Sequence, residues 1–149
     1  MWRALSLLAM LMSVDVRAQT LVPYQIEKGA IAQSLTGKPG DPAKGRAIVV
    51  ERQKGLCLLC HSGPFPEERF QGDLAPSLAG TGSRLSEGEI RLRMVDSTKV
   101  NEKTIMPPYY KTEGLERVAA NYKAKTLLNP QETEDVIAFL VTLKDETQK

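Results

Sequence analysis

The two cysteines of this 149-residue chain stand three positions apart and are followed directly by its only histidine, in the segment Cys57-Leu58-Leu59-Cys60-His61. Cysteines at this spacing on one helical turn point to the same side, where each thiol can bond to one vinyl group of a porphyrin. The histidine that follows can then donate a ring nitrogen to the iron. The segment therefore predicts one covalently attached haem c, bound through Cys57 and Cys60, with His61 as an iron ligand.

Three other uses of paired cysteines suit the chain less well. A structural zinc site usually takes four Cys or His ligands, and the chain contains three such residues in total. A redox-active dithiol is expected beside a strand–helix–strand pattern, which the sequence lacks. A plain disulfide between the two cysteines leaves His61 unexplained, so haem attachment is the interpretation we adopt.

The second axial ligand must be another residue type, because a second histidine is absent from the chain. Methionine is the usual partner of histidine in electron-carrying cytochromes c. Met94 stands on the apolar stripe of a predicted helix, where methionine more often fills the core. Pro107 disfavours helix at Met106, so we expect Met106 on an extended loop above the far haem face, as the ligand. An iron position that is open or filled by an external ligand is the alternative.

A histidine and a methionine on the same iron leave no vacant position for a substrate. Such a centre favours outer-sphere electron transfer, and the soft thioether raises the potential by favouring ferrous iron. The other ring nitrogen of His61 needs an acceptor that fixes the ring. We expect a backbone carbonyl from residues 74–76 in this role, with that of Pro76 preferred.

Local signals predict an all-α fold, the cytochrome c fold with one haem and long irregular loops. Aromatic residues are 5% of the chain, so a buried macrocycle would supply bulk that the core lacks. Residues 61–84 and 96–112 are expected to be irregular because of their glycines and prolines. We also expect Gly45 to allow a close helix crossing against Phe139. Three helix starts are predicted from N-caps, at Asp41-Pro42, at Ser86 with Glu89, and at Asn129-Pro130.

The N-terminus has the pattern of a secretory signal peptide, residues 1–18. Arg3 precedes an apolar stretch that ends near Val14 and is shorter than the ~20 residues of a membrane-spanning helix. The mature chain would start at Gln19 and reside in the periplasm. We divide it into an N-terminal extension, residues 19–43, outside the core, and a cytochrome c domain, residues 44–146. No membrane span is expected, and a net charge of +2 argues against a nucleic-acid partner.

From about residue 35 to residue 144, the chain resembles SoxX, the cytochrome subunit of the SoxAX complex of bacterial thiosulfate oxidation. The haem motif is shared by all cytochromes c, whereas Gly63-Pro64-Phe65-Pro66-Glu67-Glu68 and Ile105-Met106-Pro107-Pro108-Tyr109-Tyr110 are more specific. Further matching segments are Ser34-Leu35-Thr36-Gly37-Lys38-Pro39-Gly40-Asp41-Pro42, Leu74-Ala75-Pro76-Ser77-Leu78-Ala79-Gly80 and Arg91-Leu92-Arg93-Met94-Val95-Asp96.

The resemblance implies a non-catalytic, electron-transferring subunit of an L-cysteine S-thiosulfotransferase complex. It implies a heterodimer with a SoxA-like cytochrome, transient contact with the SoxYZ carrier, and a downstream cytochrome c as electron acceptor. The family ligands match His61 and Met106. Two other functions stay open at this point: a free-standing electron-carrier cytochrome, and a ligand-binding haem sensor or peroxidase with an open iron position.

Overall fold

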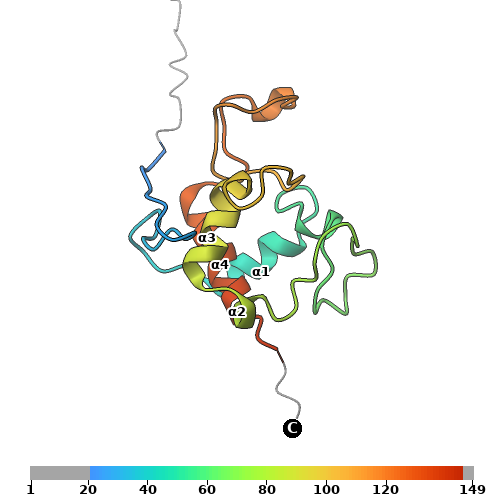
Figure 1. Cartoon of the computed structure of the whole chain (residues 1–149). Coiled ribbons are helices and arrows are strands. Elements are labelled where there is room, and N and C mark those ends of the chain that lie inside the picture. Colours follow the sequence, from blue (N-terminus) through green and yellow to red (C-terminus); the bar gives the residue numbers. More distant parts are fainter. Residues whose placement is uncertain (1–20, 146–149) are drawn as a thin grey trace, which may run out of the picture.

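A computed structural model describes residues 21–145, and the predicted signal peptide and Gln19 lie outside the described residues. Within 21–145 the chain forms helices joined by long loops, and its β-type pairing is one isolated bridge between Glu27 and Ala30. The all-α class is therefore confirmed (Figure 1). In this part of the chain, no helix is both long and apolar enough to cross a membrane. The elements are α1 (Pro42–Val50), η1 (Cys57–Leu59), α2 (Thr81–Arg84), α3 (Glu87–Asp96), η2 (Ser97–Lys99), η3 (Ala120–Tyr122) and α4 (Pro130–Thr142).

The three predicted helix starts are confirmed by their caps. The Asp41 side chain accepts hydrogen bonds from the first free backbone N–H groups of α1. Ser86 and Asn129 each form a capping box, with Glu89 and Glu132 as the reciprocal partners. These caps satisfy N–H groups that have no partner inside their own helices, which stabilises each start by about 1 kcal/mol.

The helix ends and loops differ from the sequence prediction in two places. The sequence predicts that the helix starting at Asp41-Pro42 runs to Gly55, a residue that commonly ends helices, but α1 ends at Val50. The intervening residues close a turn in which the Gly55 N–H donates to the Glu51 carbonyl (2.9 Å). The segment 61–84, expected to be irregular throughout, ends in the single turn of α2. α2 follows Gly80, whose φ of +66° is a conformation that glycine adopts without steric cost.

α1 crosses α4 at very short range, as Figure 1 shows. A β-carbon on Gly45 would lie 1.9 Å from the Asp135 carbonyl oxygen and 2.9 Å from the Phe139 β-carbon. The predicted close crossing of Gly45 against Phe139 is therefore confirmed, and a larger residue at this position would push the two helices apart.

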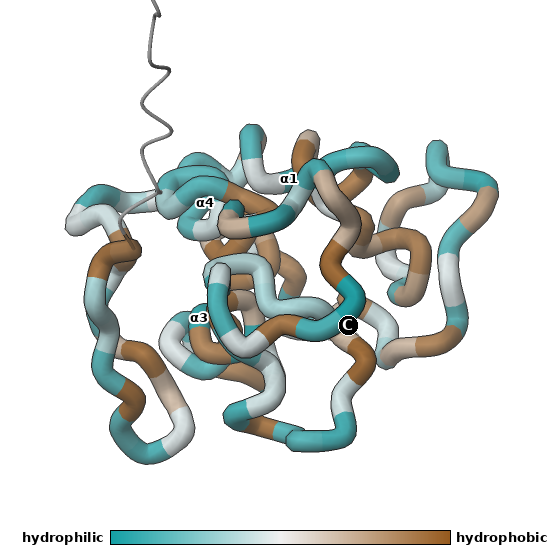
Figure 2. The backbone as a smooth tube through the Cα atoms, turned by 90° about the horizontal axis from the view of Figure 1, so that it is seen from above, coloured by the Kyte–Doolittle hydropathy of each residue, from teal (hydrophilic) through white to brown (hydrophobic). Residues whose placement is uncertain are grey.

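Buried apolar side chains form two clusters, and hydrophobic and hydrophilic stretches alternate along both the helices and the loops (Figure 2). The large cluster joins α1, η1, α3, α4 and their loops: Ile48, Val49, Leu58, Phe65, Leu78, Ile90, Met94, Tyr109, Leu128, Val136, Ile137, Phe139 and Leu140. The small cluster joins the N-terminal segment to the other face of α3: Ile31, Leu35, Leu92, Val95 and Tyr110.

The small cluster corrects one prediction about the N-terminal extension. Ile31 and Leu35 are 1% and 2% exposed, so this part of residues 19–43 belongs to the core and does not lie outside it. The reason is tertiary: α3 is apolar on two faces, and the N-terminal segment covers the face that α4 leaves free.

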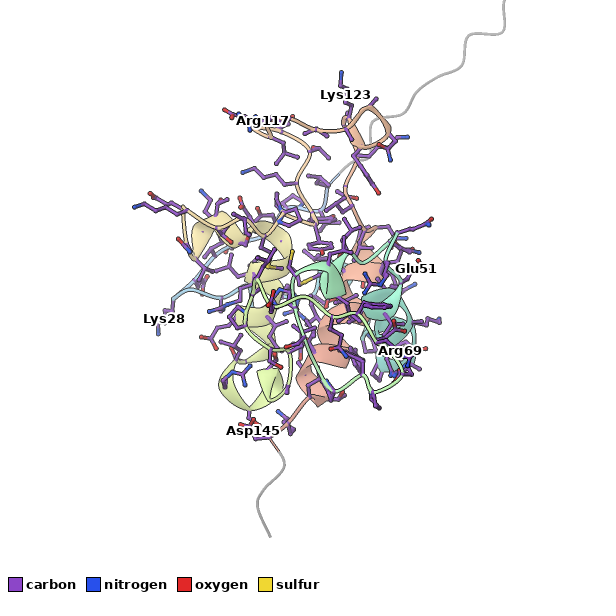
Figure 3. The ribbon with its side chains drawn as sticks, turned by 90° about the vertical axis from the view of Figure 1, so that its right-hand side faces the viewer. Lys28, Glu51, Arg69, Arg117, Lys123 and Asp145 are labelled. Atoms are coloured by element: carbon purple, nitrogen blue, oxygen red, sulfur yellow. The ribbon has the colours of Figure 1, made fainter. Side chains whose placement is uncertain are left out.

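Residues 111–126 form a loop that projects from the helices, with Arg117 and Lys123 at its far end (Figure 3). This loop forms an open pocket of about 420 Å³, lined by residues that include Leu115 and Tyr122. None of the four predicted haem residues lines the pocket, so it is not the predicted cofactor site.

Candidate haem-binding site

The cysteines and the histidine are brought together by one helical turn, which we call the attachment turn (residues 57–61). Its hydrogen bonds run to the Cys57 carbonyl from the N–H of Cys60 (3.2 Å) and of His61 (2.9 Å). The turn is entered through Leu56, whose φ of +59° is a left-handed conformation that few residues other than glycine adopt. No disulfide joins the two cysteines, so each sulfur is available for a thioether bond.

Cys57 is held in a protonated state by its surroundings. Its Sγ lies 3.3 Å from the Gly55 carbonyl oxygen and 4.0 Å from the Tyr109 hydroxyl. Burial raises the pKa of the Cys57 thiol to about 11, because the low-dielectric interior disfavours the thiolate. Redox-active dithiols usually have a lowered thiol pKa, which this buried position does not provide.

His61 is oriented by the carbonyl that the sequence analysis preferred. Its Nδ1 lies 2.7 Å from the Pro76 carbonyl oxygen. A carbonyl can only accept, so Nδ1 carries the proton and Nε2 presents its lone pair on the opposite side of the ring. This is the tautomer and orientation that a metal-ligating histidine needs.

The loop that carries Pro76 is held against the attachment turn by backbone contacts. The Ala75 N–H donates to the Cys60 carbonyl (3.0 Å), and the Leu78 N–H donates to the Ser62 carbonyl (2.8 Å). Arg84 adds a side-chain contact, because its guanidinium donates to the Ala79 carbonyl (2.6 Å) and the Ser77 carbonyl (3.0 Å). The position of Pro76 is therefore fixed from both sides.

Gln71 and Gly72 organise the same loop, and the sequence analysis missed both. The Gln71 side chain accepts from the Gly63 N–H (2.7 Å) and donates to the carbonyls of Phe65 (2.8 Å) and Glu68 (3.0 Å). A β-carbon on Gly72 would lie 2.6 Å from the Cys60 α-carbon. In the sequence, an amide residue followed by glycine inside a long loop could have indicated a loop-organising contact. The spacing does not say which backbone groups the amide contacts.

Met106 lies at the border of the large cluster, as Cys57 does, and is partly buried. Its N–H donates to the Thr104 hydroxyl (3.1 Å), and its carbonyl accepts from the Ser97 hydroxyl (2.8 Å). The backbone on both sides of the side chain is thus anchored. Met94, the other candidate ligand, is 2% exposed inside the large cluster. At such a position a methionine fills space in the core.

The comparisons with known proteins give one strong finding. No protein-family model matches the chain, and no curated protein matches it. A chain in the crystal structure of SoxXA from P. pantotrophus has 37% sequence identity and a TM-score of 0.75. The match covers 82% of this chain and 95% of that chain. The chain belongs to the SoxX family. The resemblance seen in the motifs is thereby confirmed, and the arrangement of helices around the attachment turn is that of a SoxX-like cytochrome subunit.

Proposed function

We propose that this SoxX family member is a monohaem cytochrome c, the electron-transfer subunit of a periplasmic SoxAX complex that oxidises thiosulfate. Cys57 and Cys60 would attach the haem covalently. His61 and Met106 would be its iron ligands. The division into a signal peptide (1–18), an N-terminal extension (19–43) and a cytochrome c domain (44–146) belongs to the same proposal, with the extension packed into the core through Ile31 and Leu35.

The observation that carries the proposal is the hydrogen bond between His61 Nδ1 and the Pro76 carbonyl oxygen (2.7 Å). This bond leaves Nε2 on the side of the His61 ring opposite the Pro76 carbonyl, and His61 is partly exposed. His61 directly follows Cys60, and neither cysteine of the turn is in a disulfide. A haem c needs these three groups in this order. The donor set therefore fits the group that the family implies.

The residues of this chain would each do a defined part of the work. When bound, the haem supplies a reversible one-electron iron couple. The Pro76 carbonyl keeps the His61 ring in the orientation that a ligand needs. Met106 would be the second iron ligand, and its soft sulfur would favour the ferrous state. With His61 and Met106 both held by the iron, no position would remain open for a substrate, so the subunit would carry electrons and leave the bond-making chemistry to its partner.

A SoxA-like cytochrome is the partner that we propose, in a heterodimer. The similarity to a chain from the SoxXA crystal structure supports this pairing. In the proposed L-cysteine S-thiosulfotransferase complex, thiosulfate is coupled oxidatively to a cysteine of the SoxYZ carrier. The electrons released by that coupling would then pass through this subunit to a downstream cytochrome c.

The test is expression of the full chain with a SoxA-like subunit in a periplasm that has a haem c maturation system. We expect the purified chain to exceed the mass of its processed polypeptide by one haem and to elute with the SoxA-like subunit. A Cys57→Ala/Cys60→Ala variant is the control and should be colourless. A haem-bearing chain that stays monomeric beside the partner at micromolar concentration would leave the free-standing carrier as the function, and a colourless wild-type chain would refute haem attachment.

A further inference from the structure

Tyr109 connects the two halves of the proposed haem site. It is 3% exposed, and its hydroxyl donates to the Gly55 carbonyl oxygen at 2.5 Å. Gly55 stands two residues before Cys57, and Tyr109 stands three residues after Met106. One side chain therefore links the segment that carries the thiols to the segment that carries the proposed methionine ligand.

The Gly55 end of this link is rigid. A β-carbon on Gly55 would lie 2.0 Å from the Ile48 carbonyl oxygen, so the backbone of Gly55 is in direct contact with the backbone of α1. The Gly55 N–H also donates to the Glu51 carbonyl (2.9 Å). The oxygen that accepts from Tyr109 is thus held at a fixed position beside the attachment turn.

The Tyr109 end is equally constrained. Its N–H donates to the Met94 carbonyl of α3 (2.9 Å), and its carbonyl accepts from the N–H of Leu127 (3.1 Å). Between Tyr109 and Met106 lie Pro107 and Pro108, whose rings fix the backbone angle φ and leave the segment few conformations. A displacement of Tyr109 is therefore transmitted to Met106.

Haem attachment at Cys57 would leave the Tyr109 hydroxyl as the remaining side-chain donor to the Gly55 carbonyl. The free Cys57 thiol also donates to the Gly55 carbonyl (3.3 Å). When a thiol adds across a vinyl group, a carbon–sulfur bond forms, the sulfur hydrogen passes to carbon, and no S–H donor remains. Tyr109 is then the donor that keeps this buried carbonyl satisfied, and a buried carbonyl without a donor is costly.

We propose that Tyr109 is a positioning residue that holds the Met106 loop in register with the attachment turn. The inference rests on the proposed function, because it takes Met106 as the iron ligand. Its consequence is measurable: without the Tyr109 hydroxyl, the methionine should be displaced more easily from the iron by an added ligand.

Tyr110 offers a matched control. It is 1% exposed, and its hydroxyl also has one backbone partner, the Val22 N–H at 2.9 Å. That partner lies on the N-terminal segment and not beside the attachment turn. Tyr109→Phe and Tyr110→Phe each remove one buried oxygen from adjacent residues and keep the aromatic ring, so both are expected to fold.

The experiment titrates imidazole into the ferric, haem-bearing full chain and follows the weak far-red absorption band of methionine-bound iron. We expect imidazole to bind Tyr109→Phe about fivefold more tightly than wild type, which corresponds to about 1 kcal/mol at 1.4 kcal/mol per tenfold. Tyr110→Phe should bind imidazole as wild type does. Global unfolding of both variants is measured in parallel, because a merely structural role would lower stability without changing imidazole affinity selectively.

An unchanged imidazole affinity in Tyr109→Phe, or an equal gain in both variants, would overturn the proposal. Failure of the underlying function gives a different result. If Met106 is not the ligand, the wild-type chain lacks the far-red band and Met106→Ala binds imidazole as wild type does. If Met106 is the ligand and Tyr109 has no positioning role, Met106→Ala alone changes the affinity.

Discussion

The two buried clusters differ in the contacts that surround their apolar side chains. The large cluster borders the attachment turn and has Cys57 and Met106 at its edge. The small cluster lies between the N-terminal segment and α3, and two ion pairs with buried carboxylates stand beside it. On the side of the attachment turn the ion pairs are exposed, as in Arg46–Glu67, whereas beside the small cluster the two ion pairs each have a buried carboxylate. The comparison teaches that charge is buried on one side of the molecule and stays at the surface on the other.

The stronger of the two ion pairs fixes the N-terminal segment. Arg91 and Glu134 are 1% and 2% exposed. They form a bidentate ion pair, with Nε–Oε1 and Nη2–Oε2 distances of 2.9 Å each. The same two side chains hold the N-terminal segment, because Arg91 donates to the Ile31 carbonyl (2.9 Å) and Glu134 accepts from the Leu35 N–H (2.8 Å). The pair therefore joins three parts of the chain.

The largest effect is expected for Glu134→Gln, which keeps the shape and removes the charge. Arg91 would stay buried with only the mostly exposed Glu87 as a charged partner, so we expect a loss of about 3 kcal/mol in the free energy of unfolding. Denaturant titration of the haem-bearing protein measures it. Exchange of the Leu35 amide proton should also accelerate. A loss below about 1 kcal/mol would contradict the role assigned to this pair.

A smaller effect is expected at the second ion pair, and it depends on pH. Asp96 accepts from the Lys111 Nζ (3.0 Å) and from the N–H of Thr98 (3.2 Å). Burial acts to raise the pKa of Asp96, but the hydrogen bonds from Thr98 and the contact with Lys111 outweigh it and lower that pKa from the ordinary 3.8.

A lowered carboxyl pKa means that the stabilisation is present above the ordinary pKa and is lost as the pH falls through the lower value in the folded protein. We therefore expect Asp96→Asn to be less stable than wild type at neutral pH. The difference should shrink below about pH 4, where the wild type loses its own contribution. Unfolding curves at several pH values measure this, with Asp73→Asn at an exposed loop position as the control. A difference that stays constant down to pH 2 would contradict the assignment, since Asp96 would then titrate alike in both states.

The smallest effect is expected for two matched substitutions, one in each cluster, which compare the clusters directly. Ile31 and Ile137 are 1% and 0% exposed, one in each cluster. Ile31→Val and Ile137→Val each remove one buried methylene, and we expect each to cost about 1 kcal/mol of unfolding free energy. Equal costs would show that the small cluster belongs to the cooperative core. No measurable cost at Ile31 would mean that the N-terminal segment separates before the domain unfolds.

Much of this molecule could be predicted from short stretches of sequence, because the interactions concerned are local. The attachment turn lies within five residues, and each helix cap lies within four. Even the Pro76 carbonyl could be expected, since a metal-ligating histidine needs an acceptor and residues 74–76 lie on the loop that follows it. The attachment of a haem and the ligand role of Met106 stay predictions of the same kind.

The contacts that join distant segments could not be predicted in this way. Arg91 and Glu134 are 43 positions apart, and Tyr109 and Gly55 are 54 apart. The first pair depends on how α3 packs against α4, and the second joins the segment after α1 to a loop held by α3. No local spacing carries that information. The burial of Ile31 and Leu35 depends on the same packing, which is why residues 19–43 resembled an outer extension. Local chemistry in the chain thus specified where a haem would be attached, and only the packed helices decided what holds that site in shape.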